Sequence, residues 1–320
     1  MTVANKNFKI VTPKNQLQLY GYKYYFDTFA NLFKNNKLPN TILLSGLKGS
    51  GKATFAYHLI NYVFANKEQF PYDLSNFKIN NSNKSFNLIK NNSHPNFHLI
   101  DLLDDKKVIE ISQIRKMINY ANKSAFNNKE RIILIDNAEN LNLNSSNALL
   151  KIIEEPNDNV FFILIFDNNK KILETVKSRC LKFNFALSSN ECIYITNQII
   201  QRDINDIINL DLINYYNTVG DFINLINFSL STNLEVSNLD LKFFLINIIE
   251  NKHYRKDTFI KNNIYKFIEF YFLKLISLNK SQKQIPLLYE NFIKKIFYLK
   301  KFNLDEEAFF IEFKTKILNG

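Results

Sequence analysis

The sequence predicts an α/β domain with a parallel five-stranded sheet and helices on both faces, followed by an all-helical region. Three observations support this prediction. Short apolar runs alternate with helical patterns, a glycine cluster separates the first run from the next helix, and strand signals stop after Ser188. Strands that alternate with helices along a chain are typical of parallel sheets covered by helices.

Five short apolar runs are rich in Ile, Leu, Val and Phe and are bounded by polar or turn residues. They are residues 41–45, 97–101, 132–136, 160–166 and 181–185. Runs of this kind are typical of strands that are buried on both faces of a parallel sheet. We therefore expect five strands with both faces covered.

Helical periodicity fills most of the intervals between these runs. The predicted helices are residues 54–64, 111–121, 145–155 and 171–177. Residues 66–93 are polar, rich in asparagine and weakly patterned. We therefore expect a loop-rich excursion there.

After Ser188 the apolar residues recur at helical spacing, as at Cys192, Ile195 and Ile199. A polar break at residues 231–238 precedes long predicted helices. These are residues 241–250, 258–278, 287–300 and 306–318. The pattern predicts an α/β domain at 1–186, a small helical domain at 187–236 and a larger one at 237–320.

The composition describes a basic protein with few cysteines. The net charge is +11, yet only five of the 41 basic residues are arginine. A lysine-rich solvated surface, favoured by A/T-rich codons, explains this charge more simply than a phosphate-binding face does, although both explanations stay open.

Cys180 and Cys192 cannot form a disulfide framework or a four-cysteine zinc site. Because the longest apolar run is also far too short to span a membrane, we expect a cytoplasmic protein.

Three of the six glycines lie within six positions, directly after the first predicted strand and before a helix. This stretch has the spacing G-x-x-x-x-G-K of a phosphate-binding P-loop, in the strand–loop–helix context that the motif requires. Glycine allows backbone N–H groups to turn inward around an anion. We expect Gly46, Gly49, Ser50, Gly51 and Lys52 to bind a nucleotide, with Lys52 at the β- and γ-phosphates; a plain glycine turn is the alternative.

Other parts of this nucleotide site are altered. Ala53 stands where a Ser or Thr hydroxyl would hold Mg²⁺, so we expect no firmly held metal. Asp136 ends a predicted strand, as in a Walker B motif, and could face a metal through water. The next residue, Asn137, is a neutral amide that cannot act as a base. Glu139 is expected to point elsewhere, and we expect weak or absent hydrolysis.

Two further motifs make a resemblance specific. Residues 147–156 read Asn-Ala-Leu-Leu-Lys-Ile-Ile-Glu-Glu-Pro, and residues 178–180 read Ser-Arg-Cys. Taken alone, the first motif is an amphipathic helix with a charged end. Together with the P-loop and the Walker B-like strand, in this order and spacing, they resemble bacterial DNA polymerase III clamp-loader subunits. The resemblance covers residues 15–185 by motif and implies an AAA+ P-loop domain, an all-α lid and an all-α collar that joins subunits into a ring.

The departures favour the delta-prime branch of this family over the hydrolysing gamma/tau branch. Ala53 and Asn137 are two of them. Phe166-Asp167 stands where Thr or Ser would sense a γ-phosphate, and Gly220 lies near the place of a lid arginine. The resemblance then implies that ATP can be bound at the P-loop without hydrolysis. It also implies that Arg179 acts in trans, as an arginine finger on the ATP of a neighbouring subunit.

The same resemblance implies the partners. These are gamma/tau and delta subunits, and through their complex a sliding clamp and primed DNA, whose backbone lysines would contact without sequence specificity. No membrane partner is implied. Many relatives carry a four-cysteine zinc module, but residues 66–93 contain no cysteine, so we expect no zinc.

Two other functions are compatible with the P-loop. The first alternative is an ATP-hydrolysing subunit of gamma/tau type, and the second is an unrelated P-loop enzyme such as a small-molecule kinase. A kinase would need an acceptor-binding acid or lid arginines near the phosphates, and none stands out after Gly51. Cys180 is expected to be a buried, unreactive thiol at the start of a strand.

Overall fold

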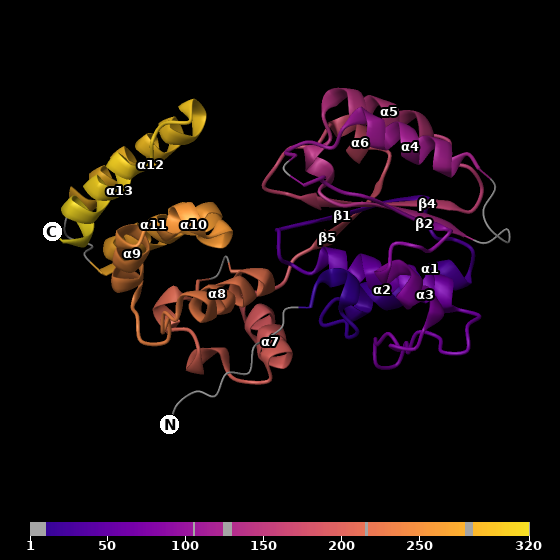
Figure 1. Cartoon of the computed structure of the whole chain (residues 1–320), viewed down its shortest axis with the longest axis horizontal. Helices are drawn as coiled ribbons and strands as arrows, with labels where there is room; N and C mark the ends of the chain where they lie inside the picture. The colour runs from indigo at the N-terminus through magenta and orange to yellow at the C-terminus, as the bar shows by residue number, and fades with distance from the viewer. Residues whose placement is uncertain (1–10, 105, 124–129, 215–216, 279–283, 320) are drawn as a thin grey trace. The chain divides into compact units, whose positions relative to one another are not determined.

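The computed structural model describes residues 11–104, 106–123, 130–214, 217–278 and 284–319. By its contacts the chain divides after Glu191 into two compact units. The first unit contains the sheet and the second is helical (Figure 1).

The sheet of the first unit has five parallel strands in the order β2-β3-β4-β1-β5 (Figure 1). The strands are β1 (Thr41–Gly46), β2 (Phe97–Ile100), β3 (Arg131–Ile135), β4 (Val160–Asp167) and β5 (Leu181–Phe185). This confirms the predicted parallel five-stranded sheet, with bounds that shift by about one residue, as is usual for strand ends.

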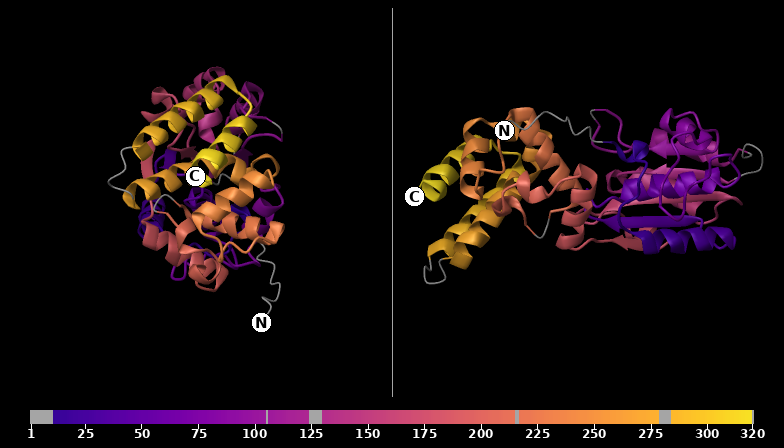
Figure 2. Two further views of the ribbon diagram at one scale, coloured as in Figure 1. Left: turned by 90° about the vertical axis from the view of Figure 1, so that its left-hand side faces the viewer. Right: turned by 90° about the horizontal axis from the view of Figure 1, so that it is seen from below.

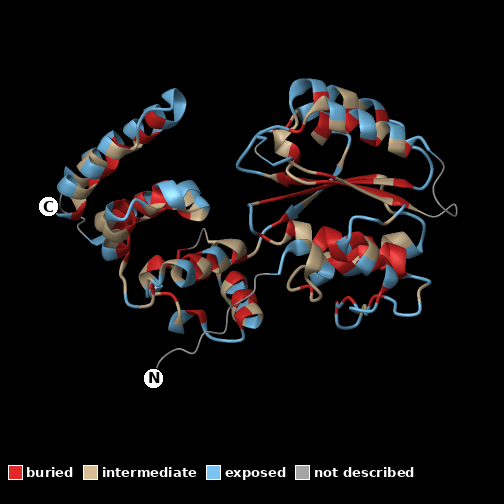
Figure 3. Cartoon of the chain, viewed as in Figure 1, coloured by how far each residue is buried: buried red, intermediate tan, exposed pale blue. Residues whose placement is uncertain are grey.

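Helices cover both faces of the sheet, as predicted (Figure 1). One face carries α1 (Lys23–Lys34), α2 (Lys52–Ala65) and α3 (Lys84–Lys90), and the other carries α4 (Ile111–Ala121), α5 (Leu143–Ile153) and α6 (Glu174–Lys177). Successive residues of a strand point to opposite faces of the sheet. Leu44 therefore packs in the core with α1, α2 and α3, and Leu43 in the core with α4 and α5. Figure 3 shows the buried residues concentrated in the central strands and in α2, which is buried over most of its length.

Burial on both faces does not extend to the whole sheet. β1 and β3 are buried along their entire length, but most of β5 is exposed or half-buried. The expectation of five doubly covered strands is therefore wrong for β2, of which only Ile100 is buried, and for β5. Strand β5 lies at an edge of the sheet, where Lys182 and Asn184 reach solvent and only Phe185 is fully buried.

Residues 66–93 are more ordered than the sequence predicts. They contain α3, which begins after Asn83, whose side chain accepts the N–H of Phe86 and so caps the helix. Phe86 and Ile89 then join the same hydrophobic core as the residues of α1 and α2. The expected loop-rich excursion is therefore a partly helical segment fixed by its own buried side chains.

The second unit is all-helical in the residues described, as predicted. Figures 1 and 2 show its helices, coloured from red-orange to yellow along the chain. They are α7 (Ser189–Ile200), α8 (Val219–Thr232), α9 (Leu241–Glu250), α10 (His253–Lys256), α11 (Thr258–Leu278), α12 (Gln284–Phe302) and α13 (Glu307–Phe313), which a π-helical turn follows (Lys314–Leu318).

Within this unit, α8 contacts the helices that follow it. The ring of Phe228 packs edge-on against Phe244 of α9 and His253 of α10. The predicted lid and collar, with their division at residue 236, stay a prediction. None of the described helices is both long enough and apolar enough to cross a bilayer.

Candidate functional site

The carboxyl ends of the central strands bring the predicted nucleotide residues to one edge of the sheet. The P-loop follows β1 and leads into α2, Asp136 follows β3, and Asp167 ends β4. Gly46 and Asp167 are register partners on neighbouring strands. Crevices at the carboxyl ends of parallel strands are the usual binding places in open α/β sheets.

The glycines of this loop are required by local geometry. A Cβ on Gly46 would lie 2.2 Å from the carbonyl oxygen of Phe185 on the neighbouring strand β5, so no side chain fits there. Gly49 and Gly51 have φ values of +85° and +92°, in the region that favours glycine. The loop therefore keeps the backbone shape that its sequence predicts.

Lys52 is turned toward the loop itself. Its side chain is buried, and Nζ donates to the carbonyl oxygens of Gly46, at 2.8 Å, and Leu47, at 2.6 Å. Burial lowers the pKa of Lys52 to about 8, against the opposing effect of nearby carboxylates, of which Asp167 is the strongest. In this conformation the ammonium bonds to the carbonyls of its own loop.

Asp136 lies beside a second carboxylate. Burial, and next the charge of Asp101, raise the pKa of Asp136 to about 6. Its Oδ1 accepts the backbone N–H of Asn137. The Asn137 side chain turns toward β2, where Nδ2 donates to Oδ1 of Asp101 at 2.7 Å. Asn137, the neutral amide after Asp136, is therefore held as a hydrogen-bond donor to an acid.

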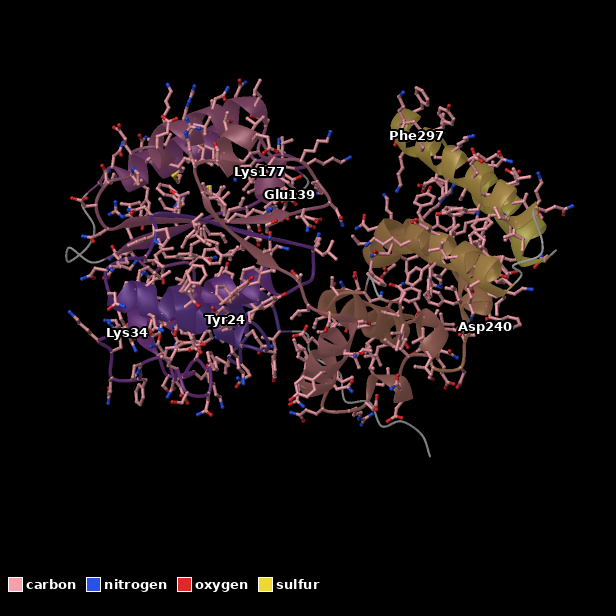
Figure 4. All side chains as sticks on the ribbon, turned by 180° about the vertical axis from the view of Figure 1, so that it is seen from behind. Tyr24, Lys34, Glu139, Lys177, Asp240 and Phe297 are labelled. Carbon is pink, nitrogen blue, oxygen red and sulfur yellow. The ribbon has the colours of Figure 1, made fainter. Side chains whose placement is uncertain are left out.

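Glu139 reaches this site, contrary to our expectation. Its side chain is almost fully buried, Oε2 accepts the backbone N–H of Asp167, and Oε1 lies 3.4 Å from Nζ of Lys170. Figure 4 labels Glu139. The cause is a short 3₁₀ turn, Ala138–Asn140, which redirects the chain after Asp136. The sequence does not mark Asp101 and Lys170 as site residues, because their positions near Asp136 and Glu139 depend on which strands are neighbours.

The site fits a phosphate group better than a catalytic Mg²⁺ ion. The left-handed backbone at Gly49 and Gly51 and the buried hydroxyl of Ser50, which has no described hydrogen-bond partner, suit an anion, although the backbone N–H of Ser50 bonds to the carbonyl oxygen of Leu47. Ala53 supplies no oxygen ligand at the place where a Ser or Thr hydroxyl would hold Mg²⁺. The residues therefore do not fit a complete Mg²⁺-dependent hydrolysis site.

Arg179 lies apart from these residues, in the turn between α6 and β5. Its Nη1 donates to the carbonyl oxygen of Thr175 at 3.0 Å, and Nη2 lies 2.5 Å from Oε1 of Glu154. The side chain is 36% exposed. No described contact joins it to the P-loop or to Asp136, so the predicted site residues form one group at the loop and one separate arginine.

Cys180 follows Arg179 and is half-buried, less than expected. Its thiol donates to the carbonyl oxygen of Val176, and burial raises its pKa to about 12. A thiol with such a raised pKa is a poor nucleophile, which agrees with the unreactive role expected for Cys180.

A family model described as "DNA polymerase III, delta subunit" matches residues 22–189, more than half of the chain. The chain belongs to this family. The matched region spans the P-loop, the Walker B-like strand and the Ser-Arg-Cys motif. It therefore covers every residue that the sequence assigned to the candidate site.

Curated relatives carry the names of several subunits of the same polymerase. DNA polymerase III subunit delta' of Bacillus subtilis is 26% identical over 195 residues, 61% of this chain and 56% of that protein. The delta' subunit of Pseudomonas aeruginosa is 30% identical over 31% of this chain and 30% of its own length. The gamma subunit of Buchnera aphidicola is 33% identical over 57% of this chain and 48% of its own length. The chain thus spans between about a third and just over half of these relatives.

Among solved structures, a DNA polymerase III gamma subunit-related protein from Thermotoga maritima is similar to this chain. The two share 15% identity, with a TM-score of 0.48, over 88% of this chain and 95% of that one.

Proposed function

We propose that the chain is the delta-prime-type subunit of a bacterial DNA polymerase III clamp loader, the complex that uses ATP to place a sliding clamp on primed DNA. In this proposal it assembles with gamma/tau and delta subunits through its helical unit. It serves the ATPase site of a neighbour and hydrolyses little or no ATP itself. The observation that carries the proposal is the altered P-loop site, with Ala53 and Asn137 in place of reactive side chains and Lys52 bonded to its own loop.

The proposed contribution to the neighbour comes from Arg179. A guanidinium stays charged at every physiological pH and offers five N–H donors, of which Thr175 and Glu154 engage only part. Placed against the γ-phosphate of a neighbour's ATP, it would stabilise the negative charge of the transition state. Arginine fingers supplied in trans raise rates by roughly 10³–10⁵ where they have been measured.

The chain's own P-loop is proposed to bind ATP, if at all, without hydrolysis. A phosphate would be bound by backbone N–H groups of the loop, but Lys52 would first have to leave the carbonyls of Gly46 and Leu47, and the N–H of Ser50 would have to leave that of Leu47. Asn137 could then orient a water molecule but could not take its proton. No zinc enters this proposal.

A second function is favoured by one specific observation. Relatives named gamma and tau are 33% and 29% identical to the chain over more than half its length. An ATP-hydrolysing subunit of that type would turn over ATP by itself, and Lys52→Ala would abolish this turnover. Absence of turnover by the purified chain would exclude this alternative.

Reconstitution with gamma and delta subunits tests the proposal. DNA-stimulated ATP hydrolysis would be compared for complexes that contain the native chain, Arg179→Ala or Arg115→Ala, an exposed arginine on α4 that serves as control. We expect Arg179→Ala to slow hydrolysis at the affected site by at least about tenfold while the complex still assembles. Equal rates for the native and Arg179→Ala complexes would refute it.

A further inference from the structure

The proposed arginine finger is held by an acid from a different helix. Glu154 directly follows α5, and its backbone N–H still bonds to the carbonyl oxygen of Leu150, so its position is fixed by that helix. Pro156 follows two residues later and restricts the backbone there. From this place Glu154 Oε1 reaches Nη2 of Arg179 at 2.5 Å.

The two bonds of Arg179 keep its guanidinium folded back on its own chain. Nη1 is engaged by Thr175, one helical turn earlier, and Nη2 by Glu154. We propose that Glu154 is a positioning residue that restrains Arg179 until a phosphate of the neighbouring subunit displaces its carboxylate. This inference rests on the proposed role of Arg179 in trans.

Competition between anions is the physical basis. A γ-phosphate and the Glu154 carboxylate would compete for the same guanidinium, because two anions held beside one guanidinium repel each other. The carboxylate is 46% exposed, so it can withdraw into solvent without becoming buried and unpaired. An ion pair this exposed is weak. The cost of breaking it would therefore lower the apparent affinity of Arg179 for the phosphate only about two- to fivefold.

The neighbouring residue provides a matched control. Glu155 carries the same charge one position later, is exposed, and has no described hydrogen bond or ion pair. Glu155→Gln changes the net charge by the same amount as Glu154→Gln but leaves the contact with Arg179 intact. A difference between these variants therefore reports that contact and not the general electrostatic field.

The first measurement uses the purified chain alone. Arg179 would be labelled with an arginine-selective dicarbonyl reagent, and its modification rate followed by mass spectrometry. We expect Glu154→Gln to raise the rate at Arg179 about two- to fivefold, while Glu155→Gln leaves it unchanged. Equal rates in the native chain and both variants would overturn the restraint, whatever Arg179 does in a complex.

The second measurement uses the reconstituted complex. Glu154→Gln should lower the ATP concentration for half-maximal DNA-stimulated hydrolysis about two- to fivefold without lowering the maximal rate. The double variant with Arg179→Ala should match Arg179→Ala alone. A lower maximal rate in Glu154→Gln would show that Glu154 aims Arg179 productively and would overturn the restraint. An effect of Glu154→Gln that persists without Arg179 would overturn it too, whereas the proposed function fails only if Arg179→Ala itself has no effect.

Discussion

Arg131 illustrates how one residue links two elements of the first unit. It begins β3, and its buried Nη1 donates to the carbonyl oxygens of Tyr120, Ala121 and Lys123 at the end of α4. The guanidinium also lies 4.5 Å from the centre of the Tyr120 ring. Because the carbonyl end of a helix is negative, a cation there satisfies both the hydrogen bonds and the helix dipole.

Replacing Arg131 should therefore destabilise the first unit. We expect Arg131→Met to lower the free energy of unfolding by about 2–4 kcal/mol, since several buried carbonyl oxygens lose their donor. Urea unfolding followed by circular dichroism measures this change. Arg115→Met, at an exposed position on the same helix, should stay within about 0.5 kcal/mol of the native chain. Equal losses in the two variants would contradict this role for Arg131.

Asp136 predicts a pH dependence of stability. Its pKa is raised to about 6 in the folded chain, whereas an unfolded Asp titrates near 3.9. Between these values the folded state binds the proton more tightly, so the charged Asp136 destabilises the fold above about pH 6 and this loss disappears toward pH 4. Asp136→Asn should therefore raise the free energy of unfolding by about 2 kcal/mol at pH 8 and have little effect near pH 4. A constant difference across this range would show that charge is not the cause.

At the scale of elements, the segment of residues 66–93 is held by aromatic packing. Tyr72 stacks on Phe26, with ring centres 5.0 Å apart, and its hydroxyl lies 2.9 Å from Nδ1 of the buried His58. The other nitrogen of His58, Nε2, lies 3.0 Å from the carbonyl oxygen of Gln16. A carbonyl only accepts, so Nε2 carries the proton and Nδ1 accepts from Tyr72.

This packing predicts that the segment needs no metal. A strong chelator should leave the melting temperature unchanged, whereas Tyr72→Ala should lower the free energy of unfolding by about 3 kcal/mol through the lost ring contacts. Phe70→Ala, at a more exposed ring in the same segment, serves as the control. Melting in the presence and absence of chelator, for all three chains, measures both effects. A lower melting temperature in the presence of chelator would contradict the prediction, because it would show that a bound metal stabilises the fold.

The sequence predicted elements best where burial is uniform along the chain. Strands β1, β3 and β4 are runs of apolar residues with both faces covered, so their composition marks them directly. The helix α3 lies in an asparagine-rich stretch, and its formation depends on the Asn83 cap and on burial of Phe86 and Ile89. Such tertiary contacts do not appear in local periodicity, so the helix was not predicted.

The candidate site was predictable in its contiguous part only. The P-loop residues and Asp136 are set by motif and spacing within single strand–loop units. The pairs Asn137–Asp101 and Arg179–Glu154 join residues far apart in sequence. Which residues form these pairs depends on the strand order and on where helices α5 and α6 end, and residue types alone do not specify either.

At the scale of the whole molecule, the P-loop and Arg179 are separate features. The P-loop keeps glycines at the positions that its backbone requires, with Ala53 and Asn137 beside it, while Arg179 has no described contact with the loop and is partly exposed. A subunit built in this way would contribute to a ring through its arginine and not through its own nucleotide. We therefore expect Arg179 to be important for ATP hydrolysis by the complex and Lys52 to be of little importance for it.

Two variants compared in one reconstituted clamp loader test this claim most directly. DNA-stimulated ATP hydrolysis would be measured with Lys52→Ala and with Arg179→Ala, after circular dichroism confirms that each chain is folded and size-exclusion chromatography that each complex is assembled. We expect Lys52→Ala to leave the rate within about twofold of the native complex, and Arg179→Ala to lower it at the affected site by at least about tenfold. Loss of hydrolysis with Lys52→Ala and normal hydrolysis with Arg179→Ala would contradict this claim.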